Sequence, residues 1–329
     1  MNFNKNENKK VNVFFASDER YLPYLAVAIY SLSEHASEEY DYDIKILSEG
    51  FSADSFVDLR KVIKPNVKIT VFDVRQKISD VRAQLKIRLR DYYSESIYYR
   101  MFIPSMFEDI DRAVYLDSDI VLLDDVAKLY FSDLGDNLLG AVTDESVITV
   151  PIFCDYVKRQ IGLDSADEYF NSGVLLMNLA GMRDEKVEQT FVKLLRKYNF
   201  NTVAPDQDYL NFLCRGRVCY LSAGWNKHAI EGRETCVPRE DLHLLHYNMF
   251  NKPWHYDNVP FGDEFWNLAQ RTPFAEVISE GKRSYTDEQR AGDLAAAGIL
   301  LNTAKEIYES GDSMNETAAN EVFKRPAEV

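Results

Sequence analysis

The sequence is short of positive charge. It contains 38 Lys and Arg against 53 Asp and Glu, which gives a formal net charge of −15 at pH 7 and an isoelectric point near 4.9. Such a chain is repelled by the phosphate backbone of DNA or RNA, so nucleic acid is excluded as the main partner. A small anionic ligand is not excluded, because a bound metal ion can supply positive charge locally.

Cysteines and long apolar runs are also scarce. The four cysteines form no Cys-x-x-Cys pair, and a chain of 329 residues does not need a disulfide framework, so we expect free thiols. The polar start lacks the apolar centre of a signal peptide, and no uncharged run approaches about 18 residues. We therefore expect no targeting signal, no membrane span and a cytoplasmic, bacterial location.

Apolar residues make up 46% of the chain, which is enough for a sizeable core and excludes wholesale disorder. Apolar runs alternate with helical stretches, and this order is typical of an α/β fold with a mainly parallel sheet. Strands are expected at 11–16, 44–47, 67–72, 113–116, 140–143, 172–177, 218–221 and 242–245, and helices at 21–32, 52–63, 96–106, 182–198, 263–270 and 287–308. Residues 1–260 are predicted to form one domain and residues 261–329 a helical extension with a frayed polar tail.

Two carboxylates follow the apolar run at 113–116. Asp117 and Asp119 are at i and i+2, so their side chains point the same way in extended chain. They lie where a strand ends, which is the edge where ligands bind in open α/β sheets. Two such carboxylates repel each other unless a cation lies between them, and hard oxygen ligands suit Mn²⁺ or Mg²⁺.

Other interpretations of Asp-x-Asp remain open from the residues alone. The motif can be an ordinary acidic turn after a strand. It can also be the site of an aspartyl phosphohydrolase in which Asp117 is the nucleophile, although that motif usually follows the first strand. Here it follows several strand–helix units.

A second group of residues is found near position 250. The apolar run at 242–245 ends in His246, whose imidazole is a candidate third metal ligand. Lys252 follows six residues later and is a candidate phosphate-binding cation. A buried histidine and an exposed lysine are the alternative, and the pairing with Asp-x-Asp favours the metal site.

Two further segments are candidates for sugar contacts. Asn171 offers a donor and an acceptor, as a sugar hydroxyl needs, and Gly173 permits close ligand approach. The segment Pro205-Asp206-Gln207 begins a predicted helix. Asp206 is there either an N-cap or a site residue.

Together these motifs resemble glycosyltransferase family 8, the retaining transferases that include glycogenin and bacterial lipopolysaccharide galactosyl- and glucosyltransferases. The resemblance covers residues 11–254. It rests on Phe14-Phe-Ala-Ser-Asp18 with Tyr21, Tyr99-Arg-Met101, Tyr115-Leu-Asp-Ser-Asp119, residues 133–141, Phe170-Asn-Ser-Gly-Val-Leu-Leu-Met-Asn-Leu179, Asp206-Gln-Asp208 and His246-Tyr through Lys252-Pro-Trp254.

The resemblance implies a single Rossmann-like nucleotide-binding domain of the GT-A type and a role for each matching residue. Asp117, Asp119 and His246 would hold Mn²⁺ (or Mg²⁺), which bridges the UDP diphosphate, and Lys252 would bind that diphosphate. The remaining donor contacts would be made by Ala16, Asp18, Tyr21 and Ser118 toward the nucleotide, and by Arg100, Asp144, Asn171, Asp206 and Gln207 toward the hexose.

The chain departs from the family pattern at two positions. Met249 stands where a glycine is frequent three residues after the histidine, which puts a backbone contact to phosphate in doubt. Arg20 stands where an asparagine is frequent before the tyrosine, which puts a direct ribose or sugar contact in doubt.

The predicted activity is transfer of glucose or galactose from a UDP-sugar to a hydroxyl of a glycan or lipid-linked glycan. Retention by double displacement needs a carboxylate nucleophile. The motif offers the amide of Gln207 instead, so we favour same-face attack by the acceptor, with Asp206 as the alternative nucleophile. A non-catalytic UDP-sugar-binding module is a further alternative. For residues 261–329 we expect a helical cap or a homodimer contact rather than contact with the inner face of the membrane.

Overall fold

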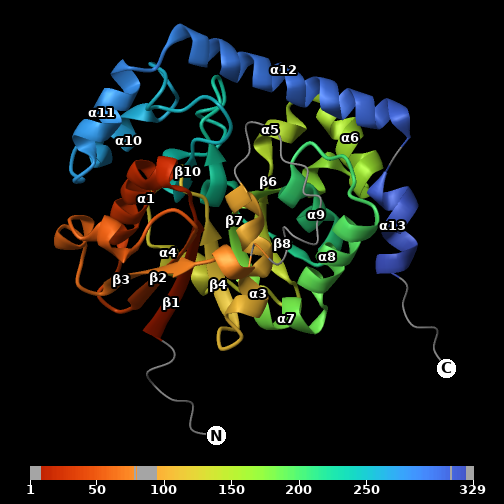
Figure 1. Cartoon of the computed structure of the whole chain (residues 1–329), viewed down its shortest axis with the longest axis horizontal. Coiled ribbons are helices and arrows are strands. Elements are labelled where there is room, and N and C mark those ends of the chain that lie inside the picture. Colours follow the sequence, from red (N-terminus) through yellow and green to blue (C-terminus); the bar gives the residue numbers. More distant parts are fainter. Residues whose placement is uncertain (1–8, 78, 80–94, 312, 324–329) are drawn as a thin grey trace, which may run out of the picture.

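The computed structural model describes residues 9–77, 79, 95–311 and 313–323. A seven-stranded sheet crosses the molecule in the order β3-β2-β1-β4-β7-β6-β8 (Figure 1). Of these strands β7 alone is antiparallel to its neighbours, so the sheet is mixed and mainly parallel, as predicted. The strands are β1 Lys10–Ala16, β2 Asp41–Ser48, β3 Val67–Asp73, β4 Arg112–Leu116, β6 Leu139–Thr143, β7 Phe170–Asn178 and β8 Val218–Tyr220.

Helices cover both faces of this sheet. On one face α1 and α4 pack on side chains such as Val13 and Phe15, and on the other face α3 and α6 to α9 pack on Phe14. Burial on both faces explains why β1 is a continuous apolar run rather than an alternating one. The helices are α1 Leu22–His35, α3 Ile103–Met106, α4 Val126–Tyr130, α5 Glu145–Ile148, α6 Pro151–Ile161, α7 Leu179–Asp184, α8 Val187–Lys197 and α9 Pro205–Leu213.

A small second sheet connects the distant parts of the site. Its strands are β5 Ile120–Leu122, β10 Leu244–His246 and β9 Lys227–His228, in that order. β10 is antiparallel to β5, with His246 opposite Ile120, and parallel to β9, with His246 beside His228. This pairing brings the end of β10 next to the chain that leaves β4.

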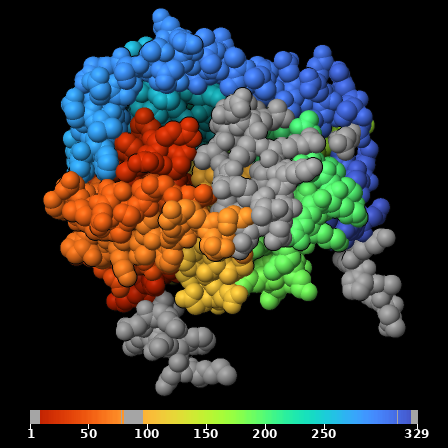
Figure 2. Space-filling view, in the orientation of Figure 1, coloured from red at the N-terminus to blue at the C-terminus, as the bar shows by residue number. Residues whose placement is uncertain are grey.

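The C-terminal extension forms α10 Gly262–Ala269, α11 Ala275–Arg283, α12 Asp287–Ser310 and α13 Met314–Val322. In Figure 1, α12 runs along the top of the molecule from α11 to the side of α6, and Figure 2 shows this blue band lying on the rest of the chain. Its buried face includes Ala296, Leu300 and Ala304. None of the helices that the structure describes is long and apolar enough to cross a membrane.

Three expected helices differ from the structure, and one of them, 96–106, is a 3-10 helix over Glu95–Phe102 followed by the short α3. Residues 52–63 form two short 3-10 turns, Ala53–Phe56 and Leu59–Lys61. The guanidinium of Arg60 donates to the carbonyl of Ala53 at 2.7 Å, which occupies the acceptor of the first α-helical turn. The helix expected at 182–198 is broken into α7 and α8 by Lys186, which adopts a left-handed conformation with φ 53°.

Candidate active site

The two strand-end carboxylates and the distant imidazole meet at one point. Asp117 follows β4, and its backbone N–H donates to the carbonyl of Gly173 on β7 at 2.8 Å. The N–H of Tyr247 donates to the carbonyl of Asp119 at 2.9 Å, which holds His246 beside this carboxylate. One ligand atom each from Asp117, Asp119 and His246 lies within 4.8 Å of the others. We call these three residues the metal cradle.

The imidazole of His246 is oriented as a metal ligand. Its Nδ1 lies 2.9 Å from Oδ1 of Asn226, and an amide oxygen there requires Nδ1 to carry the proton. Nε2 is therefore a lone pair in the neutral ring. This atom is buried, has no hydrogen-bond partner among the residues that the structure describes and lies 3.2 Å from Oδ1 of Asp119. Two electron-rich atoms facing each other in this way fit a divalent cation.

Gly173 leaves the space that the metal cradle needs. A Cβ at this position would lie 2.5 Å from Cε1 of His246 and 2.6 Å from Oδ2 of Asp117. Every other residue type would therefore push the imidazole and the carboxylate out of place. Its position on β7, opposite the end of β4, explains why glycine is required.

The metal cradle opens into a cavity of about 490 Å³, which we call the donor cavity. Of the ten residues predicted to bind the donor, Asp144, Asn171, Asp206 and Gln207 do not line this cavity and the other six do. These six are Ala16, Asp18, Tyr21, Arg100, Ser118 and Lys252. Tyr24 and Trp254 also line it, and their rings are stacked with centroids 4.0 Å apart.

Two buried cations balance the two carboxylates. Lys252 Nζ donates to Asp119, and Arg100 Nη2 donates to Oδ1 of Asp117 at 2.9 Å. Burial opposes the charge on Asp119, but the cationic Lys252 holds its pKa well below the usual range. Burial likewise lowers the pKa of Lys252, but Asp119 outweighs this and raises it. The acidic chain thus keeps positive charge at the cavity wall.

The residues predicted to contact the hexose form a buried network behind the metal cradle. Asn171 Nδ2 and Gln207 Nε2 both donate to Oδ2 of Asp144, at 3.0 and 2.9 Å. Asn226 Nδ2 donates to Oδ1 of Asn171 at 2.9 Å, which fixes the orientation of both amides. We call Asp144, Asn171, Gln207 and Asn226 the amide network. Each is at most 8% exposed, and none is among the residues that line the donor cavity.

Asp206 links the amide network to the metal cradle and is not an N-cap. The N-cap of α9 is Ala204, and Pro205 opens the helix. The Asp206 carboxylate accepts from Ser172 Oγ at 3.1 Å and pairs with Arg100 Nε at 3.1 Å. Burial raises the pKa of Asp206, against the effect of Arg100. Arg100 therefore joins Asp206 to Asp117.

Comparison with known proteins identifies the family. Residues 12–258 match the family model described as Glycosyl transferase family 8. The chain belongs to glycosyltransferase family 8. A lipopolysaccharide 1,2-glucosyltransferase of Escherichia coli is 25% identical over 301 residues, which cover 86% of each chain. A galacturonosyltransferase-like protein of Arabidopsis thaliana is 28% identical over 75% of this chain and 74% of its own.

Solved structures confirm the GT-A fold. The WbbM bifunctional glycosyltransferase superposes with a TM-score of 0.72 at 26% identity, over 86% of this chain and 53% of WbbM. The galactosyltransferase LgtC in complex with donor and acceptor sugar analogs superposes with a TM-score of 0.61 at 24% identity, over 85% of this chain and 99% of LgtC.

Sequence reasoning missed three contributors to this family 8 site. Tyr115 OH donates to Oδ1 of Asp117 at 2.9 Å, and Tyr24 forms part of the donor cavity. Asn226 orients His246 from the 3-10 turn Ala223–Asn226. Tyr115 could have been found from the sequence, because it lies two residues before Asp117 and its side chain therefore points the same way in extended chain. A lone asparagine in a turn gives no such signal.

The two departures of this transferase from the family pattern both lie at the donor cavity. Met249 has φ 63°, the left-handed conformation that glycine adopts without strain, so the backbone shape at this position is kept. Arg20 pairs with Asp18 at 2.9 Å, and the same carboxylate accepts from the N–H groups of Arg20 and Tyr21. Arg20 therefore helps to hold the loop that carries Tyr21.

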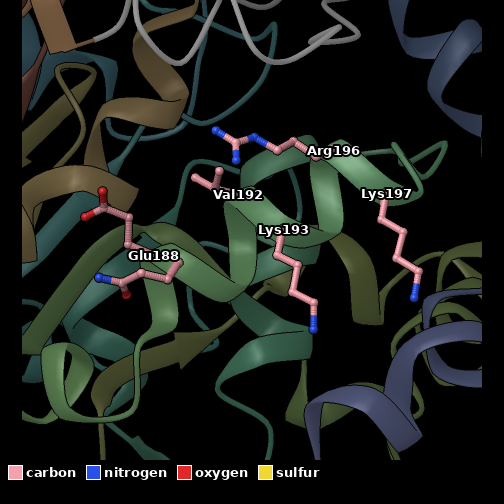
Figure 3. A pocket seen from close by; sticks show the side chains of 6 residues that line it. Glu188, Val192, Lys193, Arg196 and Lys197 are labelled. Carbon is pink, nitrogen blue, oxygen red and sulfur yellow. The ribbon is translucent and has the colours of Figure 1, made fainter.

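A hollow of about 510 Å³ lies on the surface of α8 and contains no predicted site residue (Figure 3). Its lysines are engaged elsewhere, since Lys193 and Lys197 both pair with Glu321 of α13. Its size alone does not make it a site. The donor cavity is lined by Asp117 and Asp119 of the metal cradle, so it is the candidate site of this transferase.

Proposed function

We propose that this family 8 chain transfers a hexose, glucose or galactose, from a UDP-sugar to a hydroxyl of a glycan or lipid-linked glycan, with retention and with bound Mn²⁺ or Mg²⁺. The observation that carries this proposal is the unpaired Nε2 of His246, which faces Asp119, a residue that lines the donor cavity. A site with two carboxylates and one imidazole suits such a cation.

Residues of the chain would stabilise the negative charge of the departing UDP. A bound divalent cation acts as a Lewis acid that neutralises the charge growing on UDP. Lys252 and Arg100 add positive charge at fixed positions, because each is held by a carboxylate before the donor arrives. Tyr21, which also lines the cavity, offers an aromatic face for uracil.

Same-face attack by the acceptor hydroxyl is the mechanism we favour. A covalent intermediate would need a free carboxylate beneath the sugar. Gln207 is an amide, and its oxygen already accepts from the N–H of Ser172 at 2.9 Å. Asp206 is occupied by Arg100 and Ser172. The leaving phosphate oxygen would then accept the acceptor's proton, and the amide network would hold the sugar in position.

The acceptor would enter beside Met249. A hollow of about 270 Å³ is lined by Ser146, His228 and Met249, and it shares the segment 248–250 with the donor cavity. The acceptor hydroxyl would therefore approach the donor sugar from the opposite side of this segment. The hollow is small, which suits one terminal sugar of a longer glycan.

The test is a panel of nucleotide sugars with Mn²⁺, Mg²⁺ or a chelator, in which release of UDP is measured by chromatography. We expect turnover with UDP-glucose or UDP-galactose and none after chelation. Release of inorganic phosphate from a sugar phosphate, with no release of UDP from these donors, would instead support the phosphohydrolase interpretation of Asp117. Binding of UDP-sugar with no release of either product, across a panel of glycan acceptors, would support a binding module.

A further inference from the structure

The C-terminal extension holds the turn that carries Lys252. We call residues 252–257 the phosphate turn, after the role proposed for Lys252. Three helices of the extension each contact it at a different residue. The contacts are Trp266 Nε1 of α10 to the carbonyl of Pro253 at 3.1 Å, Lys282 Nζ of α11 to Asp257 at 2.8 Å, Arg290 Nη1 of α12 to the carbonyl of His255 at 2.9 Å, and Tyr256 OH to Asp293 of α12 at 2.8 Å.

The inner side of the phosphate turn faces the metal cradle. The carbonyl of Lys252 accepts from the N–H groups of His255 and Tyr256, at 3.0 and 2.9 Å, which closes the turn. Its Nζ reaches Asp119. A displacement of the turn would therefore move this ammonium relative to the carboxylate.

Asp293 connects α12 to the phosphate turn through a carboxylate that accepts two hydrogen bonds. Its Oδ2 accepts from Tyr285 OH as well as from Tyr256 OH, each at 2.8 Å. The ring of Tyr285 stacks on His255 with centroids 3.8 Å apart and planes 6° apart. The Arg290 guanidinium lies 5.1 Å from the centre of the Tyr256 ring. The Asp293 carboxylate thus joins the ring of Tyr256, which is part of the turn, to the ring of Tyr285, which stacks on His255 of the turn.

The extension also forms part of the donor cavity itself. Asp293 of α12 is among the residues that line it. Yet α12 lies beyond residue 258, where the match to the family model ends. This wall is consequently supplied by a segment outside the family's shared region.

We propose that α10 to α12 act as a splint that positions Lys252 for the diphosphate of a nucleotide sugar, with Asp293 as the main positioning residue. The inference rests on the proposed function and adds a role for the extension. Because the contacts are made before any ligand binds, the splint lowers the ordering cost of donor binding.

The experiment measures UDP binding by calorimetry with saturating Mn²⁺, in wild type and in Asp293→Ala. We expect the variant to bind UDP on the order of tenfold more weakly, as for loss of a charge-assisted contact. Its affinity for Mn²⁺ alone should be unchanged, because the metal cradle does not touch α12. Glu288→Ala removes the same charge from an exposed position of the same helix, and it should bind like wild type.

A second variant, Tyr256→Phe with Tyr285→Phe, removes the two donors and keeps both rings. It should also weaken UDP binding, and it should speed hydrogen exchange at residues 253–257. If Asp293→Ala does not fold, this double variant tests the splint in its place. Unchanged UDP binding in the variants would overturn the splint, as would an equal loss of Mn²⁺ affinity. Failure of wild type to bind UDP at all would instead overturn the proposed function.

Discussion

The metal cradle and the amide network both lie against strand β7 but differ in how far their polar groups are satisfied. In the amide network, Asn171 and Asn226 use both their oxygens and their nitrogens in hydrogen bonds. In the metal cradle, Nε2 of His246 is buried without a partner. A buried polar atom left unpaired is costly, whereas a fully paired network is rigid. The metal cradle is therefore suited to bind a ligand. The amide network, which we call the frame, holds the cradle in place.

The largest expected effect comes from removing a charge from the metal cradle. Asp117→Asn keeps the size of the side chain but loses the negative charge. Because a bound cation contributes several kcal/mol to catalysis, turnover should fall on the order of 10³-fold. Mn²⁺ affinity, measured by electron paramagnetic resonance, should fall with it. Asp109→Asn, an exposed change of the same kind, should leave both unchanged. An Asp117→Asn protein that binds Mn²⁺ normally would remove this residue from the cradle.

Filling the metal cradle tests its geometry without changing its charge. In Gly173→Ala the new Cβ must displace His246 or Asp117, so we expect Mn²⁺ affinity to fall by at least about tenfold and the melting temperature to drop. Gly298→Ala is the matched control, since a Cβ there meets nothing within 4 Å. Normal Mn²⁺ binding by Gly173→Ala would mean that the three side chains are not fixed as described.

A smaller effect is expected when the frame is changed and the metal ligands are kept. Asn226→Ala removes the oxygen that fixes the protonated nitrogen of His246, and loss of such a partner typically lowers metal affinity 10- to 100-fold. Asn226→Asp retains an oxygen acceptor but cannot donate to Asn171, so its Mn²⁺ affinity should lie between Asn226→Ala and wild type. If the two variants have equal affinities, the tautomer is not what Asn226 controls.

These two regions were not equally predictable from the sequence. Asp117, Asp119 and His246 follow apolar strands, and the rule that ligands bind at strand ends placed them correctly. The alternation of strands and helices likewise predicted the mixed, mainly parallel sheet. What could not be predicted was which strands pair, because the antiparallel direction of β7 leaves no trace in a strand buried on both faces.

The frame was harder to predict because its partners are distant in sequence. Asn226 touches His246 and Asn171 only after β9 and β10 have paired, and no spacing rule connects these positions. The grip of α12 on the phosphate turn is of the same kind. Asp293 lies in an amphipathic helix whose pattern predicts a packed face but not the tyrosines that its carboxylate meets.

His255 sharpens the comparison because it too has a buried, unpaired nitrogen, Nδ1, but it belongs to no cluster of candidate metal ligands among the described residues. Burial lowers the pKa of His255 to about 4, against the effect of Asp293. Between pH 6.5 and 4 the unfolded chain binds a proton that the folded chain does not, so stability is lost as the pH falls through this window. His255→Phe keeps the stacking on Tyr285 and should flatten the fall of melting temperature with pH. An unchanged pH profile would mean that folding does not shift the pKa of His255.

The smallest effect is expected at Met249, which lies at the rim of the donor cavity and outside both regions. A non-glycine residue in the left-handed conformation carries a strain of about 1–2 kcal/mol, while glycine costs roughly 0.5–1 kcal/mol more chain entropy on folding. Met249→Gly should therefore change the free energy of unfolding by no more than about 1 kcal/mol. Donor KM should stay within about twofold, because the backbone already has the shape that glycine would adopt. Met249→Val cannot adopt this shape comfortably and should destabilise the segment. A large gain in donor affinity for Met249→Gly would show instead that the methionine side chain obstructs the diphosphate.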